Sequence, residues 1–270
     1  MQYDPIKKSL GTFFNRSPFL RTVFYRLLNL LLLRAWHIKK ELKRYRKART
    51  GDVCVLDAGS GFGQYTWYMM KLSGSWKITG IDVKAEQIND CNEFIRKIKK
   101  EQQVSFKVAD LTALNEHNDY DLILCVDVME HIENDVQVFK NFKRALRSGG
   151  VLLISTPSDQ GGSDVHDDHS ESFIEEHVRD GYNMKDIQEK LKTAGFDTIE
   201  SKYSYGRPGK ISWKLSMKYP IVMLGISRLF YIILPLYYIL TFPVSLVMNF
   251  FDTSISHKTG TGLIIRASIK

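Results

Sequence analysis

The stretch VCVLDAGSGFGQYT, residues 53–66, contains an apolar run, an acid and three glycines at alternate positions, Gly59, Gly61 and Gly63. The apolar run is typical of a buried parallel strand, with Asp57 at its carboxyl end. The glycines allow positive φ angles and a close approach of the backbone to a ligand. Because open α/β sheets bind ligands at the carboxyl ends of their strands, the stretch predicts a strand that turns into a helix around a nucleotide-like ligand. The alternative is a tight turn without a ligand.

Strand-like and helix-like patterns alternate along the rest of the chain. Apolar runs predict further strands at residues 77–84, 104–111, 120–128, 151–157, 196–205 and 262–269. Helical spacing predicts helices at residues 64–72, 85–100, 134–147 and 184–194. Alternation at this rhythm favours an α/β fold, with a doubly wound, mostly parallel sheet of seven strands.

The charge of the chain is segregated. Residues 1–50 hold 13 Lys and Arg against 2 Asp and Glu, residues 51–200 hold 16 against 27, and residues 201–270 hold 9 against 1. The basic ends are also the most apolar parts, and residues 13–38 form a helical pattern of leucines and aromatic residues interrupted by arginines. Such segments favour an anionic membrane surface as partner over nucleic acid, and packing against the core is the alternative.

A second unusual segment, residues 220–251, holds a single charge. Its apolar part is long enough for a membrane span, which needs about 20 residues. If residues 262–269 rejoin the sheet that contains residues 196–205, however, the chain must return to its starting side, and two crossings would need about 40 residues. We therefore expect a hairpin in the membrane interface or in one leaflet; a buried cap, a dimer interface and a true span are alternatives. Three prolines are expected to break it into short helices: Pro220, Pro235 and Pro243.

The sequence favours a cytoplasmic location, peripheral or monotopic on the cytoplasmic face of a membrane. The amino-terminal segment lacks the long apolar core and cleavage site of a signal peptide. The three cysteines, Cys54, Cys91 and Cys125, lack the spacing of a metal site and are interpreted as small buried residues. The oligomeric state is left open.

Five segments, in order, resemble the motifs of class I S-adenosylmethionine-dependent methyltransferases, in particular the group that includes small-molecule and quinone O-methyltransferases. They are LDAGSGFG at 56–63, Asp82 after the second strand, Asp110-Leu111, YDLILCVDVMEHI at 120–132 and LRSGGVLLISTP at 146–157. The resemblance covers roughly residues 50–200 and the last strand, and it implies S-adenosylmethionine as cofactor. The implied cofactor-binding residues are Asp57, Gly59, Ser60, Gly61, Gly63, Asp82, Val83, Asp110, Leu111, Val126 and Asp127.

The chemistry of the cofactor suits these residue types. The resemblance implies that Asp82 holds both ribose hydroxyls and that Asp110 and Leu111 contact the adenine edge. Carboxylates are suitable partners for hydroxyls and for the cationic groups of the cofactor. Methyl transfer is an in-line displacement, so the protein has to align the reactants and to remove a proton from a hydroxyl nucleophile.

Candidate catalytic residues follow the fourth and fifth strands. The resemblance implies that His131 acts as a base or positions the substrate, and that His177 and Arg179 orient the substrate or close a lid. The alternative for each is a structural role in capping and packing. Asp127, Glu130 and His131 also resemble a divalent-cation element of polyprenyl-quinone O-methyltransferases, and the histidines and aspartates of residues 165–169 are a second candidate cluster. We assign no metal, because relatives keep Glu-His without one.

These observations predict a methyltransferase that acts on a lipophilic or membrane-embedded small molecule, with O-methylation of an isoprenoid, quinone-like or lipid acceptor preferred. Residues 1–50 are predicted to form a basic helical extension, residues 51–205 and 260–270 the cofactor-binding domain, and residues 206–259 a hydrophobic insertion. The alternatives are a catalytically silent membrane scaffold that binds the cofactor and an NAD-dependent oxidoreductase.

Overall fold

A seven-stranded sheet forms the centre of the computed structural model, which describes residues 17–161, 178–227 and 229–270. The strands are β1 (Val53–Ala58), β2 (Trp76–Asp82), β3 (Val104–Val108), β4 (Tyr120–Val126), β5 (Leu146–Pro157), β6 (Thr198–Ser204) and β7 (Gly262–Ser268). Their order is β3-β2-β1-β4-β5-β7-β6, and β7 alone runs antiparallel to its neighbours. The predicted doubly wound, mostly parallel sheet is therefore confirmed.

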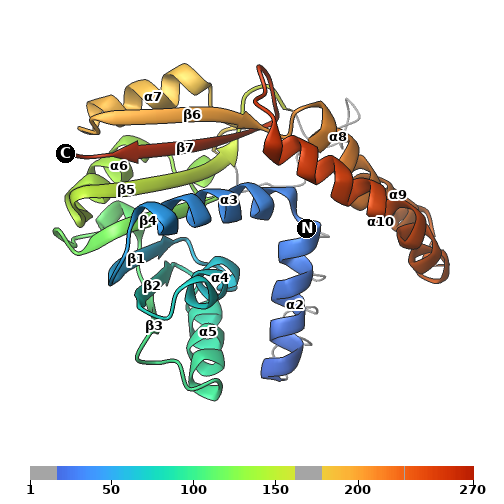
Figure 1. Cartoon of the computed structure of the whole chain (residues 1–270), viewed down its shortest axis with the longest axis horizontal. Helices are drawn as coiled ribbons and strands as arrows, with labels where there is room; N and C mark the ends of the chain where they lie inside the picture. The colour runs from blue at the N-terminus through green and yellow to red at the C-terminus, as the bar shows by residue number, and fades with distance from the viewer. Residues whose placement is uncertain (1–16, 162–177, 228) are drawn as a thin grey trace.

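Helices cover both faces of the sheet (Figure 1). They are α2 (Pro18–Leu31), α3 (Leu33–Ala48), α4 (Gln64–Leu72), α5 (Ala85–Lys97), α6 (Asp135–Ala145), α7 (Met184–Thr193), α8 (Arg207–Trp213), α9 (Tyr219–Ile226) and α10 (Phe230–Ser254). Short turns of helix lie at η1 (Leu111–Ala113) and η2 (Met129–His131), and a π-helical turn lies at η3 (Lys214–Lys218). One core cluster joins the sheet to α3, α4 and α5, and the other joins it to α6 and α7.

The amino-terminal segment packs onto the sheet domain more closely than its basic composition indicates. The helical pattern is divided at Leu32 into α2 and α3, and the basic run falls within α3, where Ile38 and Leu42 are fully buried. On α2, Arg21 is buried and donates to the carbonyl oxygens of Asp90, at 2.8 Å, and Phe62, at 3.2 Å. The core-packing alternative therefore holds for α3 and for this face of α2.

The apolar segment forms a hairpin, defined here as residues 207–254, in which α10 runs back along α8, η3 and α9 (Figure 1). The hairpin was expected, but the prediction of short helices is wrong, because α10 continues through Pro235 and Pro243 for 25 residues. Each proline removes one backbone hydrogen bond. Packing against the first arm compensates for this loss, since the Tyr237 and Tyr238 hydroxyls of α10 donate to backbone carbonyls of that arm at 2.7 and 2.9 Å.

Candidate active site

The glycine turn predicted after the first strand connects β1 to α4. Gly59, Gly61 and Gly63 all have positive φ angles, of 76°, 51° and 75°. A Cβ atom on Gly59 would lie 2.2 Å from a methyl group of Val128, so the turn touches the chain just beyond β4. A Cβ atom on Gly61 would meet nothing nearer than 3.9 Å, so the backbone at this position faces open space. The turn therefore combines close packing on one side with an open backbone on the other, as a ligand-binding turn requires.

Two predicted acids lie against this turn. Asp57 is buried at the end of β1 and accepts a hydrogen bond from the Thr66 hydroxyl at 2.5 Å. Burial raises the pKa of Asp57 to about 6, and the nearby carboxylate of Asp82 adds to the rise. Asp82, at the end of β2, accepts hydrogen bonds from the backbone N–H groups of Gly61 and Lys84, at 2.9 and 3.0 Å. These two bonds hold the Asp82 carboxylate beside the turn.

The other predicted cofactor-binding residues lie at neighbouring strand ends. Val83 follows β2 and exposes 63% of its surface, which leaves it free to contact a planar ring. Asp110 follows β3 and caps η1 through a 2.8 Å bond from Thr112 N–H, and Leu111 is buried. Val126 ends β4, and Asp127 follows it with a φ of 51°. Parallel pairing brings these ends to one edge of the sheet.

Polar atoms without partners show that this edge fits a polar ligand. Among the described residues, the Ser60 hydroxyl in the turn and the Tyr65 hydroxyl on α4 are buried and accept or donate no hydrogen bond within the protein. Buried hydroxyls are normally satisfied, because leaving one unpaired costs about 1–3 kcal/mol. The unpaired hydroxyls, the open face of Gly61 and the strand-end carboxylates match the ammonium, carboxylate and ribose hydroxyls of S-adenosylmethionine. Ser60, Gly61 and Asp82 therefore fit the predicted role of holding that cofactor, which stays a prediction.

Arg34 at the start of α3 also reaches this edge, which sequence reasoning missed. Its guanidinium forms an ion pair with Asp127, and its backbone N–H donates to the Tyr205 hydroxyl at 3.1 Å. Arg34 lies outside the five motif segments, in an apolar helical stretch, whereas Tyr65 lies within the stretch 53–66, two residues after Gly63. Only the folding of α3 over the strand ends brings Arg34 to the site, so no local signal could have identified it.

The candidate catalytic and metal-binding residues that follow β4 and β5 have different surroundings. Glu130 is buried and accepts a hydrogen bond from the Thr156 hydroxyl at 3.0 Å, and burial raises the pKa of Glu130. His131 ends η2 and is partly exposed. Arg179 donates to the carbonyl oxygens of Met129, at 2.7 Å, and Ile132, at 2.8 Å. Its guanidinium thus fixes the turn that carries His131, which favours the structural alternative.

The remaining candidates are not brought together. His177 and the cluster at residues 165–169 lie outside the described residues. Within residues 17–161, 178–227 and 229–270, no group of three or more His, Cys, Asp or Glu side chains is placed to hold a metal ion. The Glu130 carboxylate is instead bonded to Thr156, and Asp127 is paired with Arg34.

A glycine turn after β1, acids at the ends of β2, β3 and β4 and an antiparallel β7 together define a class I methyltransferase fold. The chain belongs to the methyltransferase domain family, whose model matches residues 50–213. The predicted enzyme class, a methyltransferase dependent on S-adenosylmethionine, and the predicted cofactor are confirmed by this membership. The oxidoreductase alternative is thereby excluded.

The similar proteins differ in their acceptors. Phosphoethanolamine N-methyltransferase 1 of Triticum aestivum is 31% identical over 149 residues, which are 54% of this chain and 28% of that protein. Ubiquinone biosynthesis O-methyltransferase of Pelagibacter ubique is 30% identical over 130 residues, 46% of this chain and 52% of that protein. The chain thus spans about a quarter of the first relative and about half of the second.

Among solved structures, phosphoethanolamine N-methyltransferase 2 of Haemonchus contortus, in complex with S-adenosyl-L-methionine, matches with a TM-score of 0.64 at 17% identity. The match covers 96% of this chain and 60% of that one. At this identity the match shows a shared fold. It does not transfer the acceptor of that enzyme, and the assignment to a quinone O-methyltransferase-like group stays a prediction.

Proposed function

We propose that the protein transfers a methyl group from S-adenosylmethionine to a lipophilic acceptor at a membrane surface, with an oxygen nucleophile on an isoprenoid, quinone-like or lipid molecule preferred. The observation that carries this proposal is the hairpin at residues 207–254. It places apolar residues outside and small or polar residues inside, and it leaves the sheet at the edge that holds the cofactor site.

The two arms of the hairpin meet through small and polar residues. The buried positions are Gly209, Ser212, Ser216 and Pro220 on the first arm and Ser245, Asn249 and Asp252 on α10, and all of them except Pro220 are small or polar. The Ser212 hydroxyl, for example, donates to the carbonyl oxygen of Ser245 at 3.2 Å. Helices that pack against each other in lipid typically have small residues and hydrogen-bonding polar side chains at their interface. In lipid, large apolar side chains gain no hydrophobic free energy from being buried between the helices.

The outer surface of the hairpin is apolar. Large side chains that expose between 62% and 79% of their surface include Ile226, Leu229, Tyr231, Ile232, Leu236, Ile239 and Leu240. By length and composition α10 is apolar enough to cross a membrane, and only 6% of its most apolar stretch of 18 residues is buried. A contiguous apolar surface of this kind marks a site of membrane or protein contact. The lipid-type packing inside the hairpin favours the membrane.

Charges set the depth of the hairpin. Cations occur along one side of its first arm at intervals of three or four residues, at Arg207, Lys210, Lys214 and Lys218. From Lys218 to the end of α9 at Ile226 the helix rises about 12 Å, less than the roughly 15 Å of one hydrocarbon leaflet. A further cation in the sequence, Arg228, also disfavours deep insertion. A shallow position in one leaflet, with lysines at anionic headgroups, accommodates all of these features.

The hairpin begins and ends beside the cofactor site (Figure 1). It follows β6, whose carboxyl end lies at the same edge as those of β1 and β4, and the chain returns from it into β7. Tyr205, between β6 and the hairpin, accepts the hydrogen bond from Arg34, which is paired with Asp127 at the strand end. A molecule held at headgroup depth would therefore face the site. The same placement supports a monotopic protein.

The residues of the chain have two tasks in this reaction. When bound, the cofactor supplies a methyl group that is already activated by its sulfonium. The glycine turn and Asp82 bind and orient the cofactor, while η2 presents His131 at the end of β4, where its imidazole would accept the proton of a hydroxyl nucleophile. Arg179 keeps η2 in place through its bonds to backbone carbonyls.

A second acceptor class, an amine of the phosphoethanolamine kind, is supported by the names of the wheat and Haemonchus relatives. An amine can be methylated without a strong base, so the same site suits it. The distinction between oxygen and nitrogen as the nucleophile therefore requires identification of the product.

The test incubates the protein with a total membrane extract and methyl-labelled S-adenosylmethionine, followed by solvent extraction and mass spectrometry. We expect label in a lipophilic product, as a methyl ether if the nucleophile is oxygen. The matched control is Gly59→Ala, whose new methyl group would collide with Val128 in the turn. Label only in water-soluble phosphoethanolamine derivatives would support the second class. Tight cofactor binding without any labelled product would contradict both and favour the silent scaffold.

A further inference from the structure

The inward face of α2 is polar, although most residues of this helix are apolar. Its buried side chains are Arg21, Tyr25 and Asn29, which follow one another at intervals of four residues along one side of the helix. Large apolar side chains lie on the outside, where Phe19 exposes 74% of its surface and Leu30 exposes 40%. This distribution is the reverse of that in the sheet core, and it matches that of the hairpin.

The polar face of α2 is bonded to the glycine turn. The Tyr25 hydroxyl donates to the carbonyl oxygen of Phe62, and the Arg21 guanidinium donates to the same oxygen at 3.2 Å. Asn29 Oδ1 accepts a longer bond, of 3.4 Å, from the side-chain amide of Gln64. Phe62 lies between the second and third glycines of the turn, and Gln64 directly follows the third. The three inward side chains of α2 therefore all reach the turn or the residue next to it.

These bonds constrain the backbone of the turn. Two donors on one carbonyl oxygen restrict rotation of the peptide that joins Phe62 to Gly63. The N–H of the same peptide donates to the carbonyl oxygen of Ser60 at 2.8 Å, so its orientation is linked to that of the preceding residues. Among them is Gly61, where the backbone faces open space. The docked α2 thus helps to set the shape of the turn that is predicted to hold the cofactor.

The docking of α2 gains little from burial of apolar side chains. Of its three buried residues only Tyr25 adds a ring to the core, next to Trp67 and Phe94 at centroid distances of 5.6 and 5.7 Å. The helix has 14 residues, and an isolated helix of about that length is marginally stable in water. An element with few buried apolar contacts opens at a low cost in free energy. A partner that covers the apolar outer face would stabilise the helix and lower the cost of docking.

The partner that fits this outer face is the membrane surface on which the hairpin is proposed to lie, and this step rests on the proposed function. Figure 1 shows that α2 and the hairpin project past the same end of the sheet domain. Arg26 is exposed two helical turns after Phe19, which suits anionic headgroups beside an apolar face. Because the outer face of α2 presents few large side chains, the hairpin provides the attachment and brings α2 to the surface.

We propose that α2 couples the membrane surface to the cofactor turn. Arg21 and Tyr25 position the Phe62 carbonyl, and lipid on the outer face of α2 strengthens the binding of the cofactor. Such a coupling is reciprocal, so the bound cofactor also strengthens attachment to the membrane. The enzyme thereby holds its methyl donor most tightly at the surface that contains a lipophilic acceptor.

The first experiment measures the binding of S-adenosylhomocysteine in solution by calorimetric titration. Tyr25→Phe keeps the ring but removes the donor to Phe62, and we expect about fivefold weaker binding, the equivalent of one hydrogen bond. Tyr45→Phe is the matched control, because Tyr45 on α3 is equally buried and its hydroxyl donates to the carbonyl oxygen of Asp121 at 3.1 Å, at the start of β4. The control should lose comparable thermal stability but keep its affinity within about twofold.

The second experiment repeats the titration on vesicles of phosphatidylcholine and phosphatidylglycerol. The wild type should bind S-adenosylhomocysteine at least about fivefold more tightly on vesicles than in solution, at the lower end of typical couplings. The double variant Phe19→Gln with Leu30→Gln changes two exposed side chains, and the hairpin should keep it on the vesicles in a sedimentation assay. Its affinity should be the same on vesicles and in solution, and Tyr25→Phe should lose most of the gain.

Equal or weaker binding of S-adenosylhomocysteine by the wild type on vesicles would overturn the inference, as would a full gain in the double variant. Equal affinities of folded Tyr25→Phe and Tyr45→Phe in solution would also overturn it. The proposed function fails separately. A membrane extract without any methylated lipophilic product would remove that function, whereas a rise in cofactor affinity on vesicles would still establish the coupling. A methylated lipophilic product without such a rise would leave the function and remove the inference.

Discussion

The sheet and the hairpin have opposite distributions of the same residue types. On β4, Leu122, Ile123 and Leu124 are fully buried. On α10, Ile232 exposes 79% of its surface and Leu236 exposes 62%, whereas the buried positions are Ser245, Asn249 and Asp252. In the sheet domain burial from water drives large apolar side chains inward, and buried polar groups lie mainly at strand ends and helix starts.

The difference supports the proposal that one chain is adapted to two solvents, water around the sheet domain and lipid around the hairpin. A hairpin with an apolar outside and a polar inside gains no hydrophobic free energy from its own fold in water, because its large side chains stay exposed. It gains when lipid covers those side chains and the interhelical hydrogen bonds are removed from competition with water. The part of the chain with a buried apolar core meets the part with an exposed apolar surface at the base of the hairpin, beside the predicted methyl-transfer site.

Removal of the tip is expected to have the largest effect on this contrast. We replace residues 217–240, which include Tyr237 and Tyr238, with a short Gly-Ser linker. In the native hairpin these two tyrosines contact the carbonyls of Leu215 and Ser216, so the arms are close enough at this point to be joined. The base that contains Asp252 is kept. The variant should no longer sediment with anionic vesicles. Its affinity for S-adenosylhomocysteine should stay within about twofold, because the cofactor site lies in the sheet domain.

Retention of the shortened protein on vesicles would assign the main membrane contact to another surface. The exposed apolar residues of α2 are the next candidates, namely Phe19, Leu27 and Leu30. Release from vesicles together with loss of cofactor binding would show that the hairpin supports the sheet domain in water, against the expectation.

The same substitution at two isoleucines tests the contrast residue by residue. Ile123→Lys places an unpaired charge in the sheet core and should cost more than about 4 kcal/mol, enough to unfold an ordinary domain. Ile232→Lys on α10 should leave the unfolding temperature nearly unchanged, because that side chain is exposed. It should instead weaken vesicle binding, by up to about 3 kcal/mol if the position reaches the apolar layer. A marked loss of thermal stability in Ile232→Lys would indicate a protein-covered hairpin.

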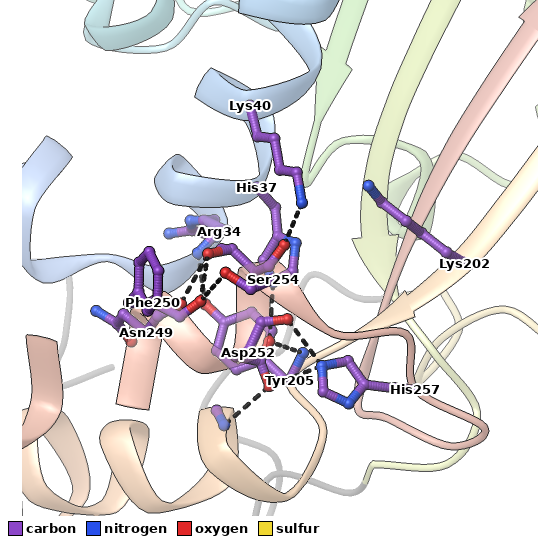
Figure 2. Close-up of polar contacts among 12 residues, drawn as sticks. Arg34, His37, Lys40, Lys202, Tyr205, Asn249, Phe250, Asp252, Ser254 and His257 are labelled. Atoms are coloured by element: carbon purple, nitrogen blue, oxygen red, sulfur yellow. Dashed lines mark hydrogen bonds and ion pairs between the residues drawn. The ribbon is translucent and has the colours of Figure 1, made fainter. Parts of the chain in front are cut away.

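The next largest effect is expected for the free energy of unfolding when the buried carboxylate of Asp252, at the base of the hairpin, is removed. Asp252 accepts hydrogen bonds from His37 Nε2 at 2.8 Å, Tyr205 N–H at 3.1 Å and Gly209 N–H at 2.9 Å (Figure 2). Asp252→Ala leaves these buried donors unpaired, and loss of one partner of a buried charged network costs about 3–5 kcal/mol. Calorimetric unfolding measures this cost.

Asp252→Asn provides the control for Asp252→Ala, because the amide keeps one oxygen acceptor and nearly the same volume. We expect it to lose less stability than the alanine variant. Equal unfolding temperatures for the wild type and Asp252→Ala would mean that the base is held by packing alone.

The parts of this structure that were predictable from the sequence are those encoded by local pattern. The strands, the glycine turn and the acids Asp57, Asp82 and Asp110 follow from apolar runs that end in a polar residue. Because strand ends of a parallel sheet converge on one edge, local pattern suffices to place these residues together.

The unpredicted parts depend on contacts between distant segments. Pro235 and Pro243 remain in one helix because the opposite arm of the hairpin supports it. The helix-breaking tendency of proline, on which the sequence prediction was based, does not take such packing between distant segments into account. Arg34 reaches the strand ends only because α3 folds across them. Arg179 turns to the carbonyls of η2, a role that is invisible in its local motif.

The smallest predicted effect concerns Asp57, a buried polar group of the sheet region with no equivalent in the apolar tip. Burial raises its pKa from 3.8 to about 6. Between these values the folded protein keeps a proton that the unfolded chain has lost, so this group's contribution to stability is complete below pH 3.8 and is lost as the pH rises to about 6. The loss is at most about 3 kcal/mol, at roughly 1.4 kcal/mol per pH unit.

The positively charged S-adenosylmethionine favours the carboxylate of Asp57, so the affinity for this cofactor should rise between pH 3.8 and about 6, while the affinity for neutral S-adenosylhomocysteine should change less. Asp57→Asn should flatten both profiles, measured by titration between pH 4.5 and 7.5, about one to two units around that pKa; a wild-type profile retained by Asp57→Asn would assign the titration to another acid of the edge.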